Sequence, residues 1–202
     1  MPSALSIWQQ LFQTPALVQY FEGVFSRIGV EVTDTGETLT VRHEGATVSF
    51  HPGLQTGVDF VVPLSSEQID LLAHYTEDGR IDAQESWRIV RAMFTPMTQA
   101  TLAHPVFAGR TLRRIAGAED LIHVRLLSPG PEPAAEHTLA YTAGQWIVTP
   151  GLLGKPMRTY SLTPEQALDY QRRVYSAMQK DSAIGWTRFA AWYRRWRVNV
   201  SA

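Results

Sequence analysis

Large aromatic side chains with helical spacing are the residues of this sequence best suited to bind a ligand or a partner. Apolar residues near the C-terminus recur every three or four positions, at Trp186, Phe189, Tyr193, Trp196 and Val200. With about 100° between successive residues, these positions form one stripe about 120° wide on a predicted helix. An earlier segment repeats the pattern at Trp87, Val90 and Phe94. Such stripes usually face a protein core, and they can also wall an apolar ligand cavity between helices and a sheet.

Arginines outside this stripe indicate another kind of surface. Four of them neighbour two tryptophans, in the set Arg188, Arg194, Arg195, Arg197, Trp192 and Trp196. Arginine and tryptophan together are typical of surfaces that contact membrane headgroups or single-stranded nucleic acid. However, the chain carries 18 basic and 19 acidic side chains, a formal net charge of −1, and has no second basic run. We therefore expect no nucleic-acid partner and at most peripheral membrane contact.

Arg158 is a charged residue at a position whose counterpart is apolar. The strand-like residues 157–160 match residues 59–62 of the first half, so that Arg158 replaces Phe60. If both strands have the same register, Arg158 points inward and can hold a ligand carboxylate or phosphate, with Tyr160 as an alternative polar anchor. If the second strand is shifted by one residue, Arg158 faces water instead. The sequence leaves both arrangements open.

Residues for catalysis or metal binding do not form a recognisable pattern. The six histidines show no i, i+2 or i, i+4 spacing, at His43, His51, His74, His104, His123 and His137. The acidic pairs Glu77-Asp78 and Glu119-Asp120 lie in polar, turn-like stretches. The chain has no cysteine, no glycine-rich phosphate loop and no Gly-x-Ser-x-Gly elbow. We therefore predict no catalytic residue, no metal site and no cofactor, and an enzyme is the less favoured alternative.

The elements that must position these side chains occur twice along the chain. Pro52-Gly53-Leu54 and the following segment 64–68 are nearly repeated at Pro150-Gly151-Leu152 and 162–166, with an offset of 98 residues. Trp87 and Trp186 match at an offset of 99. Because helices and β-rich stretches follow in the same order in both halves, we predict an internal duplication. The predicted units are residues 1–103 and 104–202, which can pack as one domain.

Local signals define the elements of each copy. Ser65 and Thr163 are predicted N-caps, each with a glutamine three residues later in a capping box. Strands are predicted at residues 38–42, 46–50, 58–62, 121–127, 138–141, 145–148 and 157–160. The proline-rich stretch 128–135 is interpreted as an enlarged hairpin loop. Thr95-Pro96 is interpreted as the start of a new helix, with a single helix kinked at Pro96 as the alternative. The predicted fold class is α+β, with duplicated helix–antiparallel sheet–helix–helix units.

A strand with a hydrophobic–Asp pattern leads into a helix in the first copy, at Val58-Asp59-Phe60-Val61-Val62-Pro63-Leu64-Ser65. Leu71-Leu72 and then Asp78-Gly79 follow it. This arrangement resembles the sterol-carrier-protein-like lipid-binding family, over residues 17–94. The resemblance implies a sterol-carrier-like fold and a non-catalytic carrier of fatty acyl or sterol-like ligands, held between a curved sheet and its helices. It transfers no catalytic residue.

The sequence therefore favours a protein that binds a hydrophobic small molecule, such as a fatty acyl, sterol-like or other lipid. The predicted pocket is lined by Phe60, Trp87, Phe94, Arg158, Tyr160, Trp186, Phe189 and Tyr193. One alternative is a protein-interaction or scaffolding module that uses the aromatic helix faces. Another is an enzyme, or an enzyme accessory domain, acting on a hydrophobic substrate. Because the chain has no cysteine, no signal-like N-terminus and no long apolar run, we expect a cytoplasmic protein.

Overall fold

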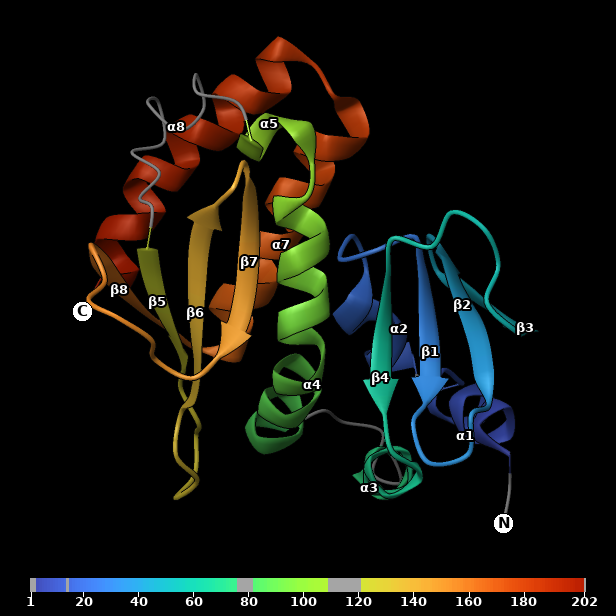
Figure 1. Cartoon of the computed structure of the whole chain (residues 1–202). Coiled ribbons are helices and arrows are strands. Elements are labelled where there is room, and N and C mark those ends of the chain that lie inside the picture. The colour runs from blue at the N-terminus through green and yellow to red at the C-terminus, as the bar shows by residue number, and fades with distance from the viewer. Residues whose placement is uncertain (1–2, 14, 76–81, 109–120, 202) are drawn as a thin grey trace. The chain divides into compact units, whose positions relative to one another are not determined.

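The β-rich stretches of each half form a four-stranded sheet, and two helices follow each sheet along the chain (Figure 1). The computed structural model describes residues 3–13, 15–75, 82–108 and 121–201. The chain divides into two compact units, Met1–Pro96 and Met97–Ala202, whereas the sequence-based prediction places the boundary after residue 103. Helices and sheets together confirm the predicted α+β class.

The first unit begins with two short helices and continues with the first sheet. Its elements are α1 (Ala4–Leu11), α2 (Pro15–Phe21), β1 (Arg27–Val32), β2 (Thr38–Glu44), β3 (Thr47–Pro52), β4 (Phe60–Leu64), α3 (Ser66–Tyr75) and most of α4 (Ala83–Leu102). The strand order is β3-β2-β1-β4. The pairs β1–β2 and β2–β3 are antiparallel, and β1–β4 is parallel.

The second unit has the same strand order. Its elements after α4 are α5 (Pro105–Ala108), β5 (Leu121–Leu126), β6 (Ala135–Thr142), β7 (Gln145–Pro150), β8 (Arg158–Leu162), α7 (Pro164–Lys180) and α8 (Ala183–Val200). The sheet order is β7-β6-β5-β8, in which β5–β6 and β6–β7 are antiparallel and β5–β8 is parallel. Residues 127–134 connect β5 to β6, as the hairpin interpretation predicts.

Both sheets are mixed, so the predicted wholly antiparallel sheets are wrong in this detail. The last strand of each sheet lies beside the first one and runs parallel to it. The reason is the connection before it, residues 53–59 in the first unit and 151–157 in the second, which carries the chain across the sheet instead of turning it back on itself. Gly53 and Gly151 begin these connections with φ of 80° and 84°, a conformation that other residues rarely adopt.

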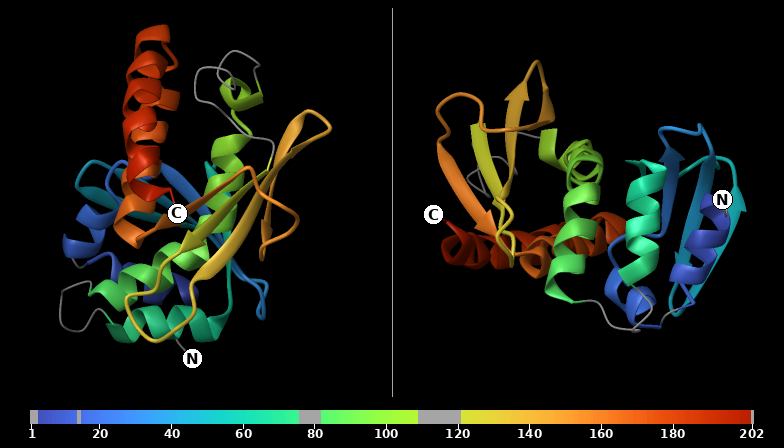
Figure 2. Two further views of the ribbon diagram at one scale, coloured as in Figure 1. Left: turned by 90° about the vertical axis from the view of Figure 1, so that its left-hand side faces the viewer. Right: turned by 90° about the horizontal axis from the view of Figure 1, so that it is seen from below.

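One face of each sheet carries the apolar side chains of the core. In β1, Ile28 and Val30 are at most 2% exposed, whereas Glu31 between the core positions faces water. In β5, Val124 is buried and Arg125 is exposed. Helices α7 and α8 lie along the apolar face of the second sheet (Figure 2). The apolar face of the sheet, which takes every second residue of a strand, therefore packs against the apolar stripes of the helices, which take every third or fourth residue.

A threonine on the second strand of each sheet binds the connection to the last strand. In the first unit, the Thr40 hydroxyl donates to the Gly53 carbonyl at 2.8 Å and accepts from the Gln55 amide at 2.9 Å. In the second unit, the Thr138 hydroxyl forms the same two bonds, at 2.7 Å and 2.8 Å, with Gly151 and Leu153. An internal duplication predicts such matching contacts.

Both predicted capping boxes are confirmed at the helices that follow the sheets. The Ser65 and Thr163 hydroxyls accept from the amides of Gln68 and Gln166, whose side chains accept from the capping residues in return. The predicted helix start at Thr95-Pro96 is wrong, and the alternative of a single helix is correct, because α4 continues through Pro96. Buried residues on both sides of the proline, among them Phe94 and Met97, hold the helix in place despite the lost hydrogen bond.

Candidate functional site

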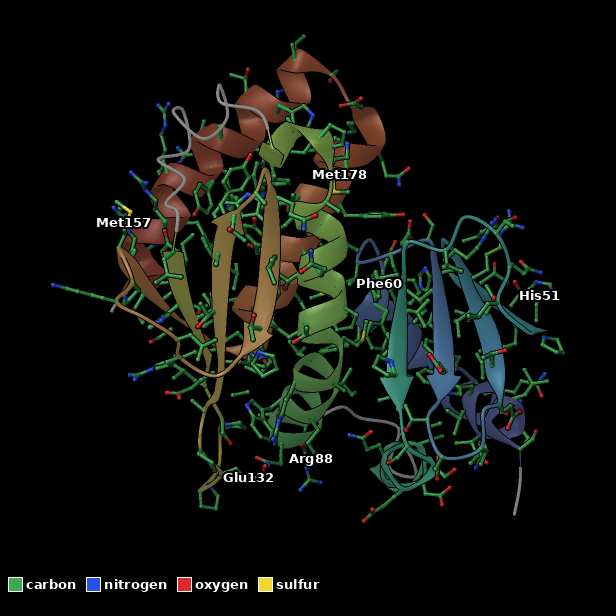
Figure 3. The ribbon with its side chains drawn as sticks, in the orientation of Figure 1. His51, Phe60, Arg88, Glu132, Met157 and Met178 are labelled. Carbon is green, nitrogen blue, oxygen red and sulfur yellow. The ribbon has the colours of Figure 1, made fainter. Side chains whose placement is uncertain are left out.

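The predicted pocket residues fall into two groups. Phe60, Trp87 and Phe94 belong to the first unit. Figure 3 shows Phe60 on β4. Arg158, Tyr160, Trp186, Phe189 and Tyr193 belong to the second unit.

The three residues of the first unit are buried in its core. Phe60, Trp87 and Phe94 are 7%, 0% and 5% exposed. Phe60 packs edge-to-face against Phe25, with ring centroids 6.3 Å apart. The guanidinium carbon of Arg91 lies 4.9 Å from the centre of the Trp87 ring. These contacts are typical of a well-packed core.

Strand pairing decides between the two orientations considered for Arg158. Ile28 on β1 pairs with Phe60, and the equivalent Ile122 on β5 pairs with Arg158. The register is therefore the same in both sheets, and Arg158 takes the position of Phe60 on the helix-facing side. Tyr160, two residues further on, shares this face and is buried at 5% exposed. A half-buried arginine thus stands beside aromatic side chains.

Six aromatic side chains from β8, α7 and α8 form what we call the tyrosine–tryptophan cluster: Tyr160, Tyr170, Phe189, Trp192, Tyr193 and Trp196. The Tyr170 ring lies at the centre, with its centroid 5.2 Å from Trp196 and 5.9 Å from Phe189. Stacking continues along α8, where the centroids of Tyr193 and Trp196 are 5.9 Å apart. The predicted stripe therefore becomes an aromatic layer between the sheet and two helices.

Trp186 lies at the other end of the stripe and has a structural role. Its indole Nε1 donates to the Asp181 carboxylate at 3.1 Å, at the tight connection between α7 and α8. Its ring packs against Phe107 and His104, with centroids 5.8 Å and 5.3 Å away. Trp186 is joined to the cluster through Phe189, 5.9 Å away. It therefore fixes the helix pair and lies away from the polar atoms of the cluster.

Several hydrogen-bond donors meet inside the tyrosine–tryptophan cluster. The hydroxyls of Tyr160 and Tyr193 lie 3.3 Å apart. Burial raises the pKa of Tyr193 well above its usual value, and nearby Tyr160 adds to this effect. Burial also raises the pKa of Tyr170, again with a contribution from Tyr160. Both hydroxyls therefore stay protonated and able to donate across the physiological pH range.

The indole Nε1 of Trp196 is buried and has no hydrogen-bond partner among the described residues. Buried donors in proteins are nearly always paired, so each exception requires an explanation. Trp8 Nε1 in the first unit is also unpartnered, but its ring stacks on Phe12. Trp196 differs because its ring adjoins three tyrosines, Tyr160, Tyr170 and Tyr193.

The sequence-based prediction missed Tyr170 and assigned Trp192 and Trp196 only to a possible surface. Tyr170 lies on α7, where Ala167, Val174 and Ala177 are buried at the i−3, i+4 and i+7 positions around it. This spacing was a usable signal, since small residues beside a tyrosine let a second helix approach closely. The α8 stripe alone does not indicate which residue of α7 faces it.

No group of three or more potential metal ligands occurs among the residues that the structure describes. Three of the described histidines are buried, and two of these have structural contacts, because the Nε2 atoms of His43 and His123 each lie 3.0 Å from a backbone carbonyl oxygen. The acidic pairs at 77–78 and 119–120 lie outside the described residues. Within the described ranges, no helix is both long and apolar enough to cross a bilayer.

Comparison of the chain with protein-family models, curated proteins and solved structures gave no significant match. Its function therefore has to be inferred from the geometry and chemistry of its own residues.

Proposed function

We propose that the protein binds a hydrophobic small molecule, without transforming it, at the tyrosine–tryptophan cluster of its second unit. The observation that carries this proposal is the buried Nε1 of Trp196, which has no partner among the described residues and lies in an aromatic layer with three tyrosines. Leaving such a donor unsatisfied costs about 1–3 kcal/mol. A ligand with a hydrogen-bond acceptor would remove this cost on binding.

The surroundings favour a ligand with an apolar body and one polar end. The ring faces offer a large apolar contact area. The indole N–H and the tyrosine hydroxyls can each donate a hydrogen bond to an acceptor on the ligand. Arg158, half-buried on the same face of the sheet, would attract an acidic head group. Fatty acyl, sterol-like and other lipid ligands share these features. The proposal thus includes the carrier function implied by the resemblance to the sterol-carrier-like family.

Ligand entry would require movement of the helix residues that close the cluster. Ring centroids within it lie 5.2–6.3 Å apart, the distances of aromatic rings in direct contact. Trp192 and Trp196 are only half-buried, so they can turn outward with less loss of packing than the buried Phe189. Binding should therefore change the intrinsic fluorescence of Trp196.

The test is a titration of the purified protein with oleic acid, followed by tryptophan fluorescence and by native mass spectrometry. We expect a one-to-one complex in the mass spectrum and a saturable fluorescence change. Trp196→Phe keeps a ring but removes the indole donor, and should weaken binding about tenfold, the effect of one lost hydrogen bond.

Trp8→Phe is the matched control, since it makes the same substitution at another buried indole without a partner among the described residues, in the first unit and outside the cluster. It should bind oleic acid like the wild type. If the wild type binds neither oleic acid nor a sterol, or if both variants bind equally well, the proposed function is wrong.

A further inference from the structure

The two units carry opposite charge. Residues 1–96 contain 5 basic and 12 acidic side chains, a formal charge of −7. Residues 97–202 contain 13 basic and 7 acidic side chains, a formal charge of +6. The overall charge of −1 hides this difference. Strong charge asymmetry between parts of a chain is typical of proteins in which one part contacts an anionic surface.

Helix α8 is the most cationic element of the second unit. Its 18 residues include four arginines and no acidic residue. Exposed helices of soluble proteins usually mix both signs, because opposite charges at i and i+4 stabilise each other. The absence of acidic residues on α8 therefore indicates a face that meets negative charge from outside the helix.

The exposed face of α8 combines these arginines with aliphatic side chains. Five exposed residues spaced three or four apart form what we call the outer stripe: Ile184, Arg188, Ala191, Arg195 and Val198. They lie within about 80° on the helix and opposite Trp186, Phe189 and Tyr193. Ile184 and Val198 are 67% and 71% exposed, among the most exposed large apolar residues of the described chain. An outer stripe with this composition has two apolar ends and a cationic middle.

A further apolar residue lies beside the C-terminal end of α8. Met157 immediately precedes β8 and is 69% exposed (Figure 3). Ser201, which caps α8, forms a bridge with Tyr160 of β8 and so brings the two elements together. Trp192 and Trp196 flank the outer stripe and are half-buried. Tryptophan beside arginine is typical of helices that lie in the headgroup region of a bilayer.

We infer that the outer stripe of α8 is a docking surface for membranes that contain anionic lipids. Charge complementarity selects an anionic partner, and the exposed aliphatic residues select a bilayer over a nucleic acid. Phosphate contacts with nucleic acid would use the arginines but leave Ile184 and Val198 in water. A bilayer buries aliphatic side chains at the depth of the acyl boundary while its headgroups hold the arginines. This inference does not depend on ligand binding at the tyrosine–tryptophan cluster.

The test is co-sedimentation of the full chain with two kinds of vesicle: phosphatidylcholine alone, and equal parts of phosphatidylcholine and phosphatidylglycerol. We expect binding to the mixed vesicles, little binding to phosphatidylcholine, and loss of binding at high salt. Replacing both arginines, in Arg188→Gln/Arg195→Gln, should weaken binding roughly 30-fold, because each headgroup-bound cation contributes roughly a fivefold effect. Replacing the aliphatic ends, in Ile184→Ser/Val198→Ser, should weaken it at least roughly tenfold.

The matched control is Arg42→Gln/Arg125→Gln, which removes the same charge from two exposed arginines of the sheets. It should bind the mixed vesicles like the wild type, and circular dichroism should show that all three variants are folded. Equal binding to both kinds of vesicle, or wild-type binding by the α8 variants, would overturn the inference. The inference would also be overturned if the protein did not bind vesicles but bound a single-stranded oligonucleotide, or self-associated in light scattering. Ligand titrations without vesicles test the proposed function separately.

Discussion

The tyrosine hydroxyls of the cluster are neutral donors because of where the rings lie. Burial makes the ionised phenolate unfavourable at Tyr193 and Tyr170, so both pKa values rise. The same burial leaves Trp196 Nε1 without a partner among the described residues. A site with neutral donors binds a carboxylate or carbonyl without having to release a proton. Ionisation of these tyrosines should therefore not change the ligand affinity around neutral pH.

The raised pKa values predict how stability depends on pH. Above about pH 10 the unfolded chain ionises its tyrosines while Tyr193 stays protonated in the folded protein. The folded state then binds more protons than the unfolded state, so the free energy of unfolding falls as pH rises, by about 1.4 kcal/mol per pH unit for each such tyrosine. Urea unfolding of the wild type and Tyr193→Phe should show a shallower decrease for the variant above about pH 10. Parallel curves would contradict the assigned burial.

Single residues differ in how far the sequence predicted them. Arg158 was found because its match, Phe60, stood in a repeated segment, and only strand pairing could decide its orientation. Tyr170 was missed because the spacing on α7 indicates only that it lies near the buried face, and its role depends on contacts with the neighbouring α8. Long-range contacts of this kind arise from packing, and periodicity gives only the face on which they occur.

At the scale of elements, the sequence predicted correctly those features that depend on residues close together in the chain. The two capping boxes involve residues three apart and form as predicted. Parallel pairing of the last strand and continuation of α4 through Pro96 depend on distant parts of the chain, and both predictions failed. The bonds of Thr40 and Thr138 to the strand connections explain why the first of these arrangements is stable in each unit.

Replacing either threonine should test whether the two connections are equivalent. Thr40→Val and Thr138→Val keep the side-chain shape at two nearly fully buried positions. Each removes two hydrogen bonds, one to a glycine carbonyl and one from a backbone amide. Each should lower the free energy of unfolding by about 2–3 kcal/mol. Thr47→Val, on an exposed strand position, is the control and should change it by less than about 0.5 kcal/mol. A large effect in only one unit would contradict equivalence.

At the scale of the whole molecule, the net charge describes neither unit. The chain carries −1 in total, whereas its two units carry −7 and +6. The information was present in the sequence, because the charges can be counted for each half. It became interpretable once the structure gave the boundary of the units and the exposed face of α8.

This separation of charge predicts unusual behaviour in ion exchange. Near pH 7 and at low salt, the full chain should be retained by both cation and anion exchangers, because each resin meets one unit of opposite sign. Arg188→Gln/Arg195→Gln should elute at lower salt from the cation exchanger, while retention by the anion exchanger is unchanged or slightly stronger. The reverse test removes two acidic side chains from the first unit. Glu31→Gln/Glu44→Gln, at two exposed strand positions, should elute at lower salt only from the anion exchanger. Retention by neither resin would mean that charges of both signs are evenly mixed over the surface, and the electrostatic basis for membrane docking would then be lost.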